Sequence, residues 1–163
     1  MQLIKYPNDV LTQVAVEWDF ENDSTAEETA DQLIELMIAS NGIGLAANQV
    51  GLLKRVFAIK LSGQEPIAMF NPRVVSESTT IVENEEGCLS FPNLWLEVKR
   101  PKQIESEYFD KHGNPCTITL SGIDCRCFLH ELDHLNGVCF TKKISPLKLA
   151  LARKKQQKRK YNG

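Results

Sequence analysis

The sequence predicts an α+β fold, in which helices and strands occupy separate stretches of the chain. A segment with helical spacing comes first, short strand-like runs follow it, and two further helical segments end the chain. This order argues against alternating β-α-β units. With 163 residues the chain is long enough to bury a core. We therefore expect a single domain over residues 1–163.

The first predicted helix begins at a capping box, formed by residues 24–27. Apolar side chains then recur with helical spacing, and Asn41-Gly42 ends the helix. These apolar positions are Ala30, Leu33, Ile34, Met37 and Ile38.

The middle of the chain contains runs of residues typical of strands. We predict strands at 55–60, 67–70, 74–82, 95–99, 104–109 and 116–120. Residues 110–115 separate the last two and carry the polar residues, Gly and Pro of a hairpin turn.

Two more helices are predicted toward the C-terminus. One starts near Asp124 as its N-cap and ends at Asn136-Gly137. The other starts at Ser145-Pro146, with proline at the favoured first position, and continues into a basic tail.

Charge is distributed unevenly along the chain. Nine of the 19 Lys and Arg residues lie between Lys142 and Lys160, and no acidic residue follows Asp133. The sequence thus predicts an acidic body with a basic helix or tail at about 146–163. Such a charge run is usually a solvated helix face; the alternative is electrostatic docking on ribosomal RNA.

Composition also predicts where the protein resides. No run of 18 apolar residues could form a membrane-spanning helix, and the N-terminus lacks the pattern of a secretion signal. Five cysteines is an odd number without a framework of paired spacings. We expect reduced thiols in the cytoplasm.

The pattern H-E-x-x-H at residues 130–134 indicates a metal site. His130 and His134 are four residues apart, so a helix places both imidazoles on one face. Glu131 lies about 100° round the helix from His130, within reach of a metal-bound water. The alternative is a helix with two ordinary histidines and an unrelated glutamate.

A catalytic site of this kind needs a third protein ligand. Phe140 stands where one metalloprotease pattern has a third histidine, and no glutamate follows Glu131 to complete another. The remaining candidates are Asp133, His112 and the five cysteines. Asp133 points away from the histidine face, and His112 lies in the predicted hairpin tip.

Among the cysteines, Cys127 shares the histidine face but sits about 10 Å along the axis from His134, too far for a short thiol. Cys116 and Cys125 are typical of small packing residues, and Cys139, after the helix, is a weaker rival. Cys88, beside Gly87, remains as the third-ligand candidate.

Three segments together resemble the signature motifs of peptide deformylases. They are GIGLAANQ at 42–49, EGCLS at 86–90 and HELDHLNG at 130–137, in the family's order and at similar separations. The resemblance implies antiparallel β-sheets packed around a central helix that carries the H-E-x-x-H motif. It also implies a monomeric, metal-dependent hydrolase that removes the N-formyl group from the formyl-methionine of newly made proteins. Its cofactor would be one divalent ion, Fe(II), which Zn, Ni or Co can replace.

The resemblance also assigns roles to residues. Cys88, His130 and His134 would bind the ion, and Glu131 would act as general base and acid for attack by the metal-bound water or hydroxide. Gln49 and the backbone N–H of Leu89 would form an oxyanion hole; without the motif, Gln49 would be a surface amide after a Gly-rich turn. The positions that line the methionine pocket in relatives are Ile43, Gly44, Glu86, Ile123, Arg126 and Cys127 here.

Further details follow from the same motifs. Glu86 and Arg100 resemble a family salt bridge that braces the Cys88 segment. Gly44 would let backbone approach the substrate closely. The chain departs from the family pattern at Leu129, at Trp95 and at Arg126, which replaces an apolar residue at the pocket rim.

Two other classes of function are less consistent with the sequence. A structural metal module would need no Glu131 between the histidines, so this residue argues against it. An RNA-binding adaptor would conflict with the acidic body and with the absence of a recognition motif. The 42–47 stretch lacks the residues of a phosphate-binding loop.

Overall fold

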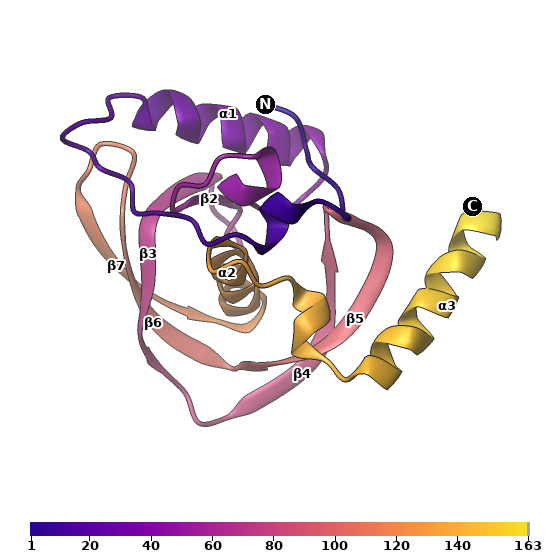
Figure 1. Cartoon of the computed structure of the whole chain (residues 1–163). Coiled ribbons are helices and arrows are strands. Elements are labelled where there is room, and N and C mark those ends of the chain that lie inside the picture. Colours follow the sequence, from indigo (N-terminus) through magenta and orange to yellow (C-terminus); the bar gives the residue numbers. More distant parts are fainter. Residues whose placement is uncertain (163) are drawn as a thin grey trace.

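Helix α2 (Gly122–Leu135) lies at the centre of the molecule, and β-strands surround it (Figure 1). The structure is a computed structural model that describes the backbone of residues 1–162 and the side chains of residues 1–159. The end of the predicted basic tail, with Gly163 and the side chains of 160–162, lies outside the described residues. The predicted α+β fold, with antiparallel sheets around the motif helix, is confirmed.

Within residues 1–162 the strands form a five-stranded and a two-stranded sheet. The larger sheet has the order β1-β2-β3-β6-β7, and every neighbouring pair is antiparallel. Its strands are β1 (Gly44–Ala46), β2 (Val56–Ile59), β3 (Ile67–Glu77), β6 (Gln103–Phe109) and β7 (Pro115–Ser121). The predicted hairpin at 110–115 joins β6 to β7, where the Asp110 carboxylate accepts hydrogen bonds from the backbone N–H groups of His112 and Asn114.

Strand β2 explains how the larger sheet separates two helices. Its side chains alternate between two apolar clusters and all four are fully buried. Phe57 packs edge-on against Phe128 of α2, at 5.3 Å between ring centroids. Val56 and Ala58 belong to the cluster that contains α1 (Ala26–Ala39). A strand buried on both faces carries no polar alternation, which is why β2 is apolar throughout.

The first helix ends as predicted but begins differently. Asn41 adopts a left-handed conformation, and the Gly42 N–H donates to the Met37 carbonyl, which ends α1. The predicted capping box is wrong, because the N-cap residue is Thr25 and its side chain makes no capping bond. The Thr25 hydroxyl instead donates to Asp23, a carboxylate that Lys54 also binds.

Helix α2 follows directly after β7, and this changes its predicted start. The N-cap is Ser121 and the helix begins at Gly122, so the prediction of Asp124 as the N-cap is wrong. Asp124 lies in the first turn, where its carboxylate accepts hydrogen bonds from the Ser62 backbone N–H and hydroxyl. A tertiary contact therefore uses the side chain that local pattern assigned to capping.

The smaller sheet pairs β4 (Ile81–Cys88) with β5 (Phe91–Pro101) across the tight turn Leu89-Ser90. The single strand predicted at 74–82 is wrong, because the chain turns between Glu77 and Ile81 and changes sheet. Strand β4 was not predicted, since four of its eight residues are charged or amide side chains. Strand β5 buries alternate residues and extends well beyond the predicted 95–99.

Short 3-10 helices connect the main elements, at η1 (Asp9–Thr12), η2 (Ala47–Val50) and η3 (Phe140–Lys143). Helix α3 (Pro146–Asn162) begins at the predicted proline and lies beside β5 at the edge of the molecule (Figure 1). Leu149 and Ala152 join the apolar cluster of β5, and Gln156 donates to the Pro92 carbonyl at 2.9 Å. Among the described residues, none of the helices has both the length and the apolar character that crossing a membrane requires.

Candidate metal centre and active site

The structure brings the three predicted ligands together from two elements. Helix α2 supplies His130 and His134, whose ring centroids are 5.0 Å apart, and the end of β4 supplies Cys88. One donor atom from each residue lies within 4.8 Å of the other two. The Cys88 Sγ is 3.3 Å from the His134 Nε2.

This donor set fits a divalent ion. The His130 Nδ1 donates to the Glu86 carboxylate at 2.8 Å, an arrangement that leaves Nε2 as the ligand nitrogen. One thiolate and two imidazoles are a ligand set that suits zinc or iron and leaves a fourth position open. Buried His134 Nδ1 has no hydrogen-bond partner among the described residues.

The pKa values of the two histidines are shifted in opposite directions. Burial lowers the pKa of His130, but hydrogen bonds to Cys88 and Glu86 outweigh burial and raise this pKa to about 10. Burial, together with the charge of His130, holds the pKa of His134 well below its usual value. A divalent ion binds the neutral form of histidine, so binding of an ion at His130 would displace a proton.

Glu131 is buried beside the two histidines. Burial raises its pKa to about 7; the His130 charge opposes this shift and the Glu86 charge adds to it. Its Oε2 has no partner among the described residues. A carboxyl group with a pKa near neutrality suits acid–base chemistry.

Gly44 makes room for Glu131. A Cβ at position 44 would lie 2.5 Å from the Glu131 Oε1 and 2.9 Å from the Cys127 Sγ, closer than atoms can pack. The close approach of substrate to Gly44 stays a prediction, but the carboxylate alone explains why a side chain is not accommodated there.

Gln49 lies in η2 and is 1% exposed, so its alternative interpretation as a surface amide is wrong. Its Oε1 accepts from the Ala46 N–H at 2.9 Å, and its Nε2 donates to the Ser90 Oγ at 3.0 Å. The same Nε2 lies 3.6 Å from the Cys88 Sγ. These contacts orient the amide N–H groups toward the metal ligands.

Ser90 is a site residue that the sequence analysis missed. It is fully buried, and its hydroxyl donates to the Ile4 carbonyl at 2.7 Å while it accepts from Gln49. Its only signal was its place at the end of the 86–90 motif. Leu89, the predicted oxyanion-hole residue, precedes it in the same turn.

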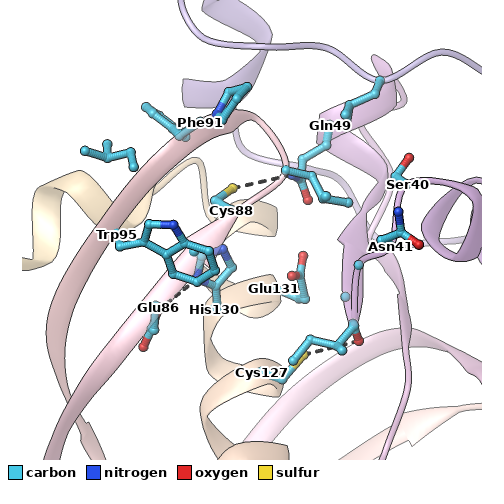
Figure 2. Close-up of a pocket in the computed structure, with 18 of the residues that line it drawn as sticks. Ser40, Asn41, Gln49, Glu86, Cys88, Phe91, Trp95, Cys127, His130 and Glu131 are labelled. Carbon is cyan, nitrogen blue, oxygen red and sulfur yellow. Dashed lines mark hydrogen bonds and ion pairs between the residues drawn. The ribbon is translucent and has the colours of Figure 1, made fainter. Parts of the chain in front are cut away.

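A pocket of about 660 Å³ opens onto the site. Figure 2 shows Cys88 and Gln49 on one side of this space and His130 and Glu131 of α2 on the other. All the predicted pocket residues line it: Ile43, Gly44, Glu86, Ile123, Arg126 and Cys127. Trp95 also lines it, half-exposed, and its ring lies so close to Gly87 that a Cβ there would be 2.6 Å away.

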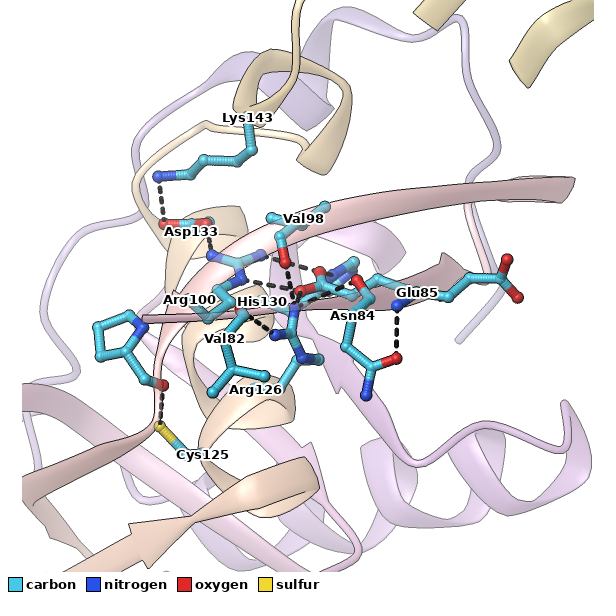
Figure 3. A network of polar contacts seen from close by, with 12 residues as sticks. Val82, Asn84, Glu85, Val98, Arg100, Cys125, Arg126, His130, Asp133 and Lys143 are labelled. Carbon is cyan, nitrogen blue, oxygen red and sulfur yellow. Dashed lines mark hydrogen bonds and ion pairs between the residues drawn. The ribbon is translucent and has the colours of Figure 1, made fainter. Parts of the chain in front are cut away.

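A buried charge network adjoins His130 (Figure 3). The predicted Glu86–Arg100 pair is present, with two hydrogen bonds of 2.9 Å each. Arg100 also donates to Asp133 at 2.6 Å, and Lys143 lies 3.5 Å from the other Asp133 oxygen. Burial opposes ionisation of Glu86, but hydrogen bonds from His130 and Arg100 hold its pKa at about 2.

The other ligand candidates have different partners. Asp133 is occupied by Arg100, and His112 contacts Glu27 at the surface. Cys127 is near the site, but its thiol donates to the Ile43 carbonyl at 3.4 Å. The remaining thiols, those of Cys116, Cys125 and Cys139, donate to backbone carbonyls elsewhere.

Comparison with known proteins gives a consistent result. The family model of polypeptide deformylases matches residues 1–150. A peptide deformylase of Thermodesulfovibrio yellowstonii is 38% identical over 164 residues, 98% of each chain. One from Prochlorococcus marinus is 42% identical over 127 residues, which cover 76% of this chain and 63% of that protein's length. The crystal structure of a Synechococcus elongatus peptide deformylase in complex with actinonin superposes with a TM-score of 0.87 at 34% identity, covering 96% of this chain and 87% of that one.

Proposed function

The chain belongs to the peptide deformylase family of metal-dependent hydrolases, and we propose that it removes the formyl group from the N-terminal formyl-methionine of newly made proteins. One observation carries the proposal: Cys88, His130 and His134 converge beside the buried carboxyl group of Glu131, at a pocket open to substrate. A structural metal module would have no use for that carboxyl group or for the pocket.

Cys88, His130 and His134 would hold the ion. When bound, a divalent ion there supplies a Lewis acid that polarises the formyl carbonyl and makes water acidic enough to attack near neutral pH.

Glu131 is proposed to move the proton. Its unpartnered Oε2 can accept a proton from the attacking water and deliver it to the methionine nitrogen as the amide bond breaks. The products are formate and a free amine. Burial supports this role, because it brings the pKa of Glu131 to about 7, where the group can both accept and release a proton.

Gln49 and the Leu89 backbone N–H are proposed to stabilise the developing negative charge on the carbonyl oxygen. Ala46 and Ser90 hold the Gln49 amide in one orientation. One Nε2 hydrogen is donated to Ser90 and the second points to the Cys88 Sγ at 3.6 Å, so a substrate oxygen would take the place of this long contact with sulfur.

Formyl and acetyl substrates distinguish a deformylase from a general aminoacylase. We expect kcat/KM for formyl-Met-Ala-Ser to exceed that for acetyl-Met-Ala-Ser by roughly a hundredfold or more, because an added methyl displaces the carbonyl by about 1 Å. The methionine side chain would add a preference of only about 1–3 kcal/mol. Equal kcat/KM values for the two peptides would overturn the proposal.

The native ion is proposed to be Fe(II), with Zn, Ni or Co as functional substitutes. One thiolate and two imidazoles also suit zinc, so the ligand set alone does not select iron. Metal analysis of protein purified under strictly anaerobic conditions tests this assignment. Zinc as the principal ion in such a preparation, with full activity, would contradict it.

We further propose that the protein acts in the cytoplasm as a monomeric, single domain and meets nascent chains at the ribosome. Helix α3 supports the ribosome contact. Its basic side chains Lys154, Lys155, Lys158 and Arg159 are exposed, whereas Leu149 and Ala152 hold the helix on β5. A basic helix fixed by its apolar side could bind RNA phosphates through its outer side.

Changing these four basic residues to glutamine tests the contact without uncovering the core beneath α3. We expect unchanged cleavage of formyl-Met-Ala-Ser and weaker, salt-dependent co-sedimentation with ribosomes. Equal co-sedimentation of variant and parent would identify the helix face as merely solvated. The molar mass of the parent protein, measured by light scattering, tests the proposed monomeric state.

A further inference from the structure

Glu86 receives more hydrogen bonds than the predicted pair with Arg100 accounts for. Its Oε1 accepts from the His130 Nδ1 at 2.8 Å and from one Arg100 nitrogen at 2.9 Å. Its Oε2 accepts from a second Arg100 nitrogen at 2.9 Å and from the Arg126 Nη1 at 2.7 Å. The four lone-pair directions of the carboxylate are thus all used.

Arg126 connects three elements. From the second turn of α2, its Nη1 also donates to the Val98 carbonyl of β5 at 2.7 Å, and its Nη2 donates to the Val82 carbonyl of β4 at 2.8 Å. Its side chain is 10% exposed. The guanidinium therefore lies between α2 and the β4–β5 hairpin, in the same network as His130 and Arg100 (Figure 3).

The predicted role of Arg126 was at the rim of the substrate pocket, where relatives carry an apolar residue. The residue does line the pocket, but its charged group is committed to Glu86 and to two backbone carbonyls. Only the rest of the side chain is left for contact with substrate.

We infer that Arg126 is a positioning residue for the metal site: it holds the Glu86 carboxylate in the orientation that directs the His130 Nε2 at the ion. The inference rests on the proposed function, because it needs Cys88, His130 and His134 to bind a metal. A carboxylate that cannot rotate fixes both the tautomer and the ring plane of the histidine it accepts from. Arg100 alone would leave one lone-pair direction of Oε2 without a donor in a buried place.

Co(II) binding to the purified, metal-free protein tests this inference without relying on activity. Arg126→Met keeps an unbranched apolar stem at the pocket wall and removes the guanidinium. We expect its Co(II) dissociation constant to rise by roughly 10- to 100-fold, which is typical when a group that orients a ligand is lost. The visible bands of Co(II) bound to thiolate should shift, and KM for formyl-Met-Ala-Ser should stay within about threefold.

Two further variants separate positioning from general stability. Arg126→Lys keeps the positive charge but cannot reach Glu86 and both carbonyls together, so it should weaken Co(II) binding less, with a dissociation constant raised several-fold. If Arg126→Met does not fold, the lysine variant carries the test. Arg73→Met is the control, because it removes an arginine from an exposed ion pair with Glu107 between β3 and β6 of the larger sheet, and should leave Co(II) affinity unchanged.

A double-mutant cycle with Glu86→Gln tests the route of the effect. If Arg126 acts through Glu86, the Arg126→Met change should weaken Co(II) binding little further in the Glu86→Gln background. Additive losses, or an Arg126→Met protein that binds Co(II) as tightly as the parent, would overturn the inference while leaving the proposed function intact. A parent protein that binds no Co(II) would overturn both.

Discussion

Helix α2 and the β4–β5 hairpin both contribute ligands to the candidate metal site formed by Cys88, His130 and His134. They hold these residues in place by different means. The separation of His130 and His134 follows from one turn of backbone hydrogen bonds within α2. The position of Cys88 depends on contacts with distant segments: Ser90 binds the Ile4 carbonyl and Gln49, 86 and 41 residues away in the chain.

The two regions should therefore respond differently to substitution. For a side chain of α2 that lies beside the metal ligands, such as Glu131, a substitution should remove the function of that residue and leave the two histidines in place, because the helix maintains their spacing. On the hairpin, a substitution should act through the partners that position the turn. Substitutions in the two regions test this contrast between α2 and the β4–β5 hairpin, and the largest effect is expected at Cys88.

Cys88→Ala should remove the one metal ligand that the hairpin supplies. We expect the parent to bind about one ion per chain and the purified variant to bind none, with formyl-peptide cleavage reduced to background. Cys127→Ala is the matched control, because this thiol lies on α2 beside the site but binds the Ile43 carbonyl. A metal-replete Cys88→Ala protein and a metal-free Cys127→Ala protein would reverse the ligand assignment.

Glu131→Gln should affect chemistry alone. The helix keeps both histidines in place, so the ion should stay bound, but an amide cannot take the proton, and kcat should fall by about three orders of magnitude. Metal content and kcat, measured on the same preparation, check this. Turnover within tenfold of the parent would show that another group acts as the base.

The decrease in kcat should be larger for Gln49→Ala than for Ser90→Ala. Removing the Gln49 amide should lower kcat by about a hundredfold, as for loss of an oxyanion-hole donor. Ser90→Ala leaves the Gln49 Oε1 bonded to the Ala46 N–H, so the amide is only partly released and kcat should fall by about tenfold. An equal loss in both variants would mean that Ser90 contributes more than the orientation of Gln49.

Gly87→Ala should have the smallest effect. Its methyl would enter the space of the Trp95 ring, but this ring is half-exposed and can move outward. We expect a loss of about 1 kcal/mol in the free energy of unfolding, seen in urea titrations, and unchanged metal content. The loss should disappear when the same change is made in a Trp95→Ala background; if it persists, the strain lies in the β4–β5 backbone.

The sequence alone predicted those features that local rules determine. Helical spacing predicted the helix that became α1, and proline at the first position predicted the start of α3. The polar turn at 110–115 predicted the hairpin between β6 and β7. The four-residue separation of His130 and His134 was enough to expect them on one face of a helix, because that spacing corresponds to about one helical turn.

Other features of the site depend on contacts between segments that are distant in the chain. Elimination left Cys88 as a candidate, and only the fold places its sulfur 3.3 Å from His134, 46 residues later in the chain. Ser90 and Arg126 could not be assigned from pattern, since a serine in a turn and an arginine on a helix have many ordinary uses. Their partners, Gln49 and Glu86, lie 41 and 40 residues away. Such contacts arise when separate elements pack, and burial then requires every charge and polar group between them to find a partner.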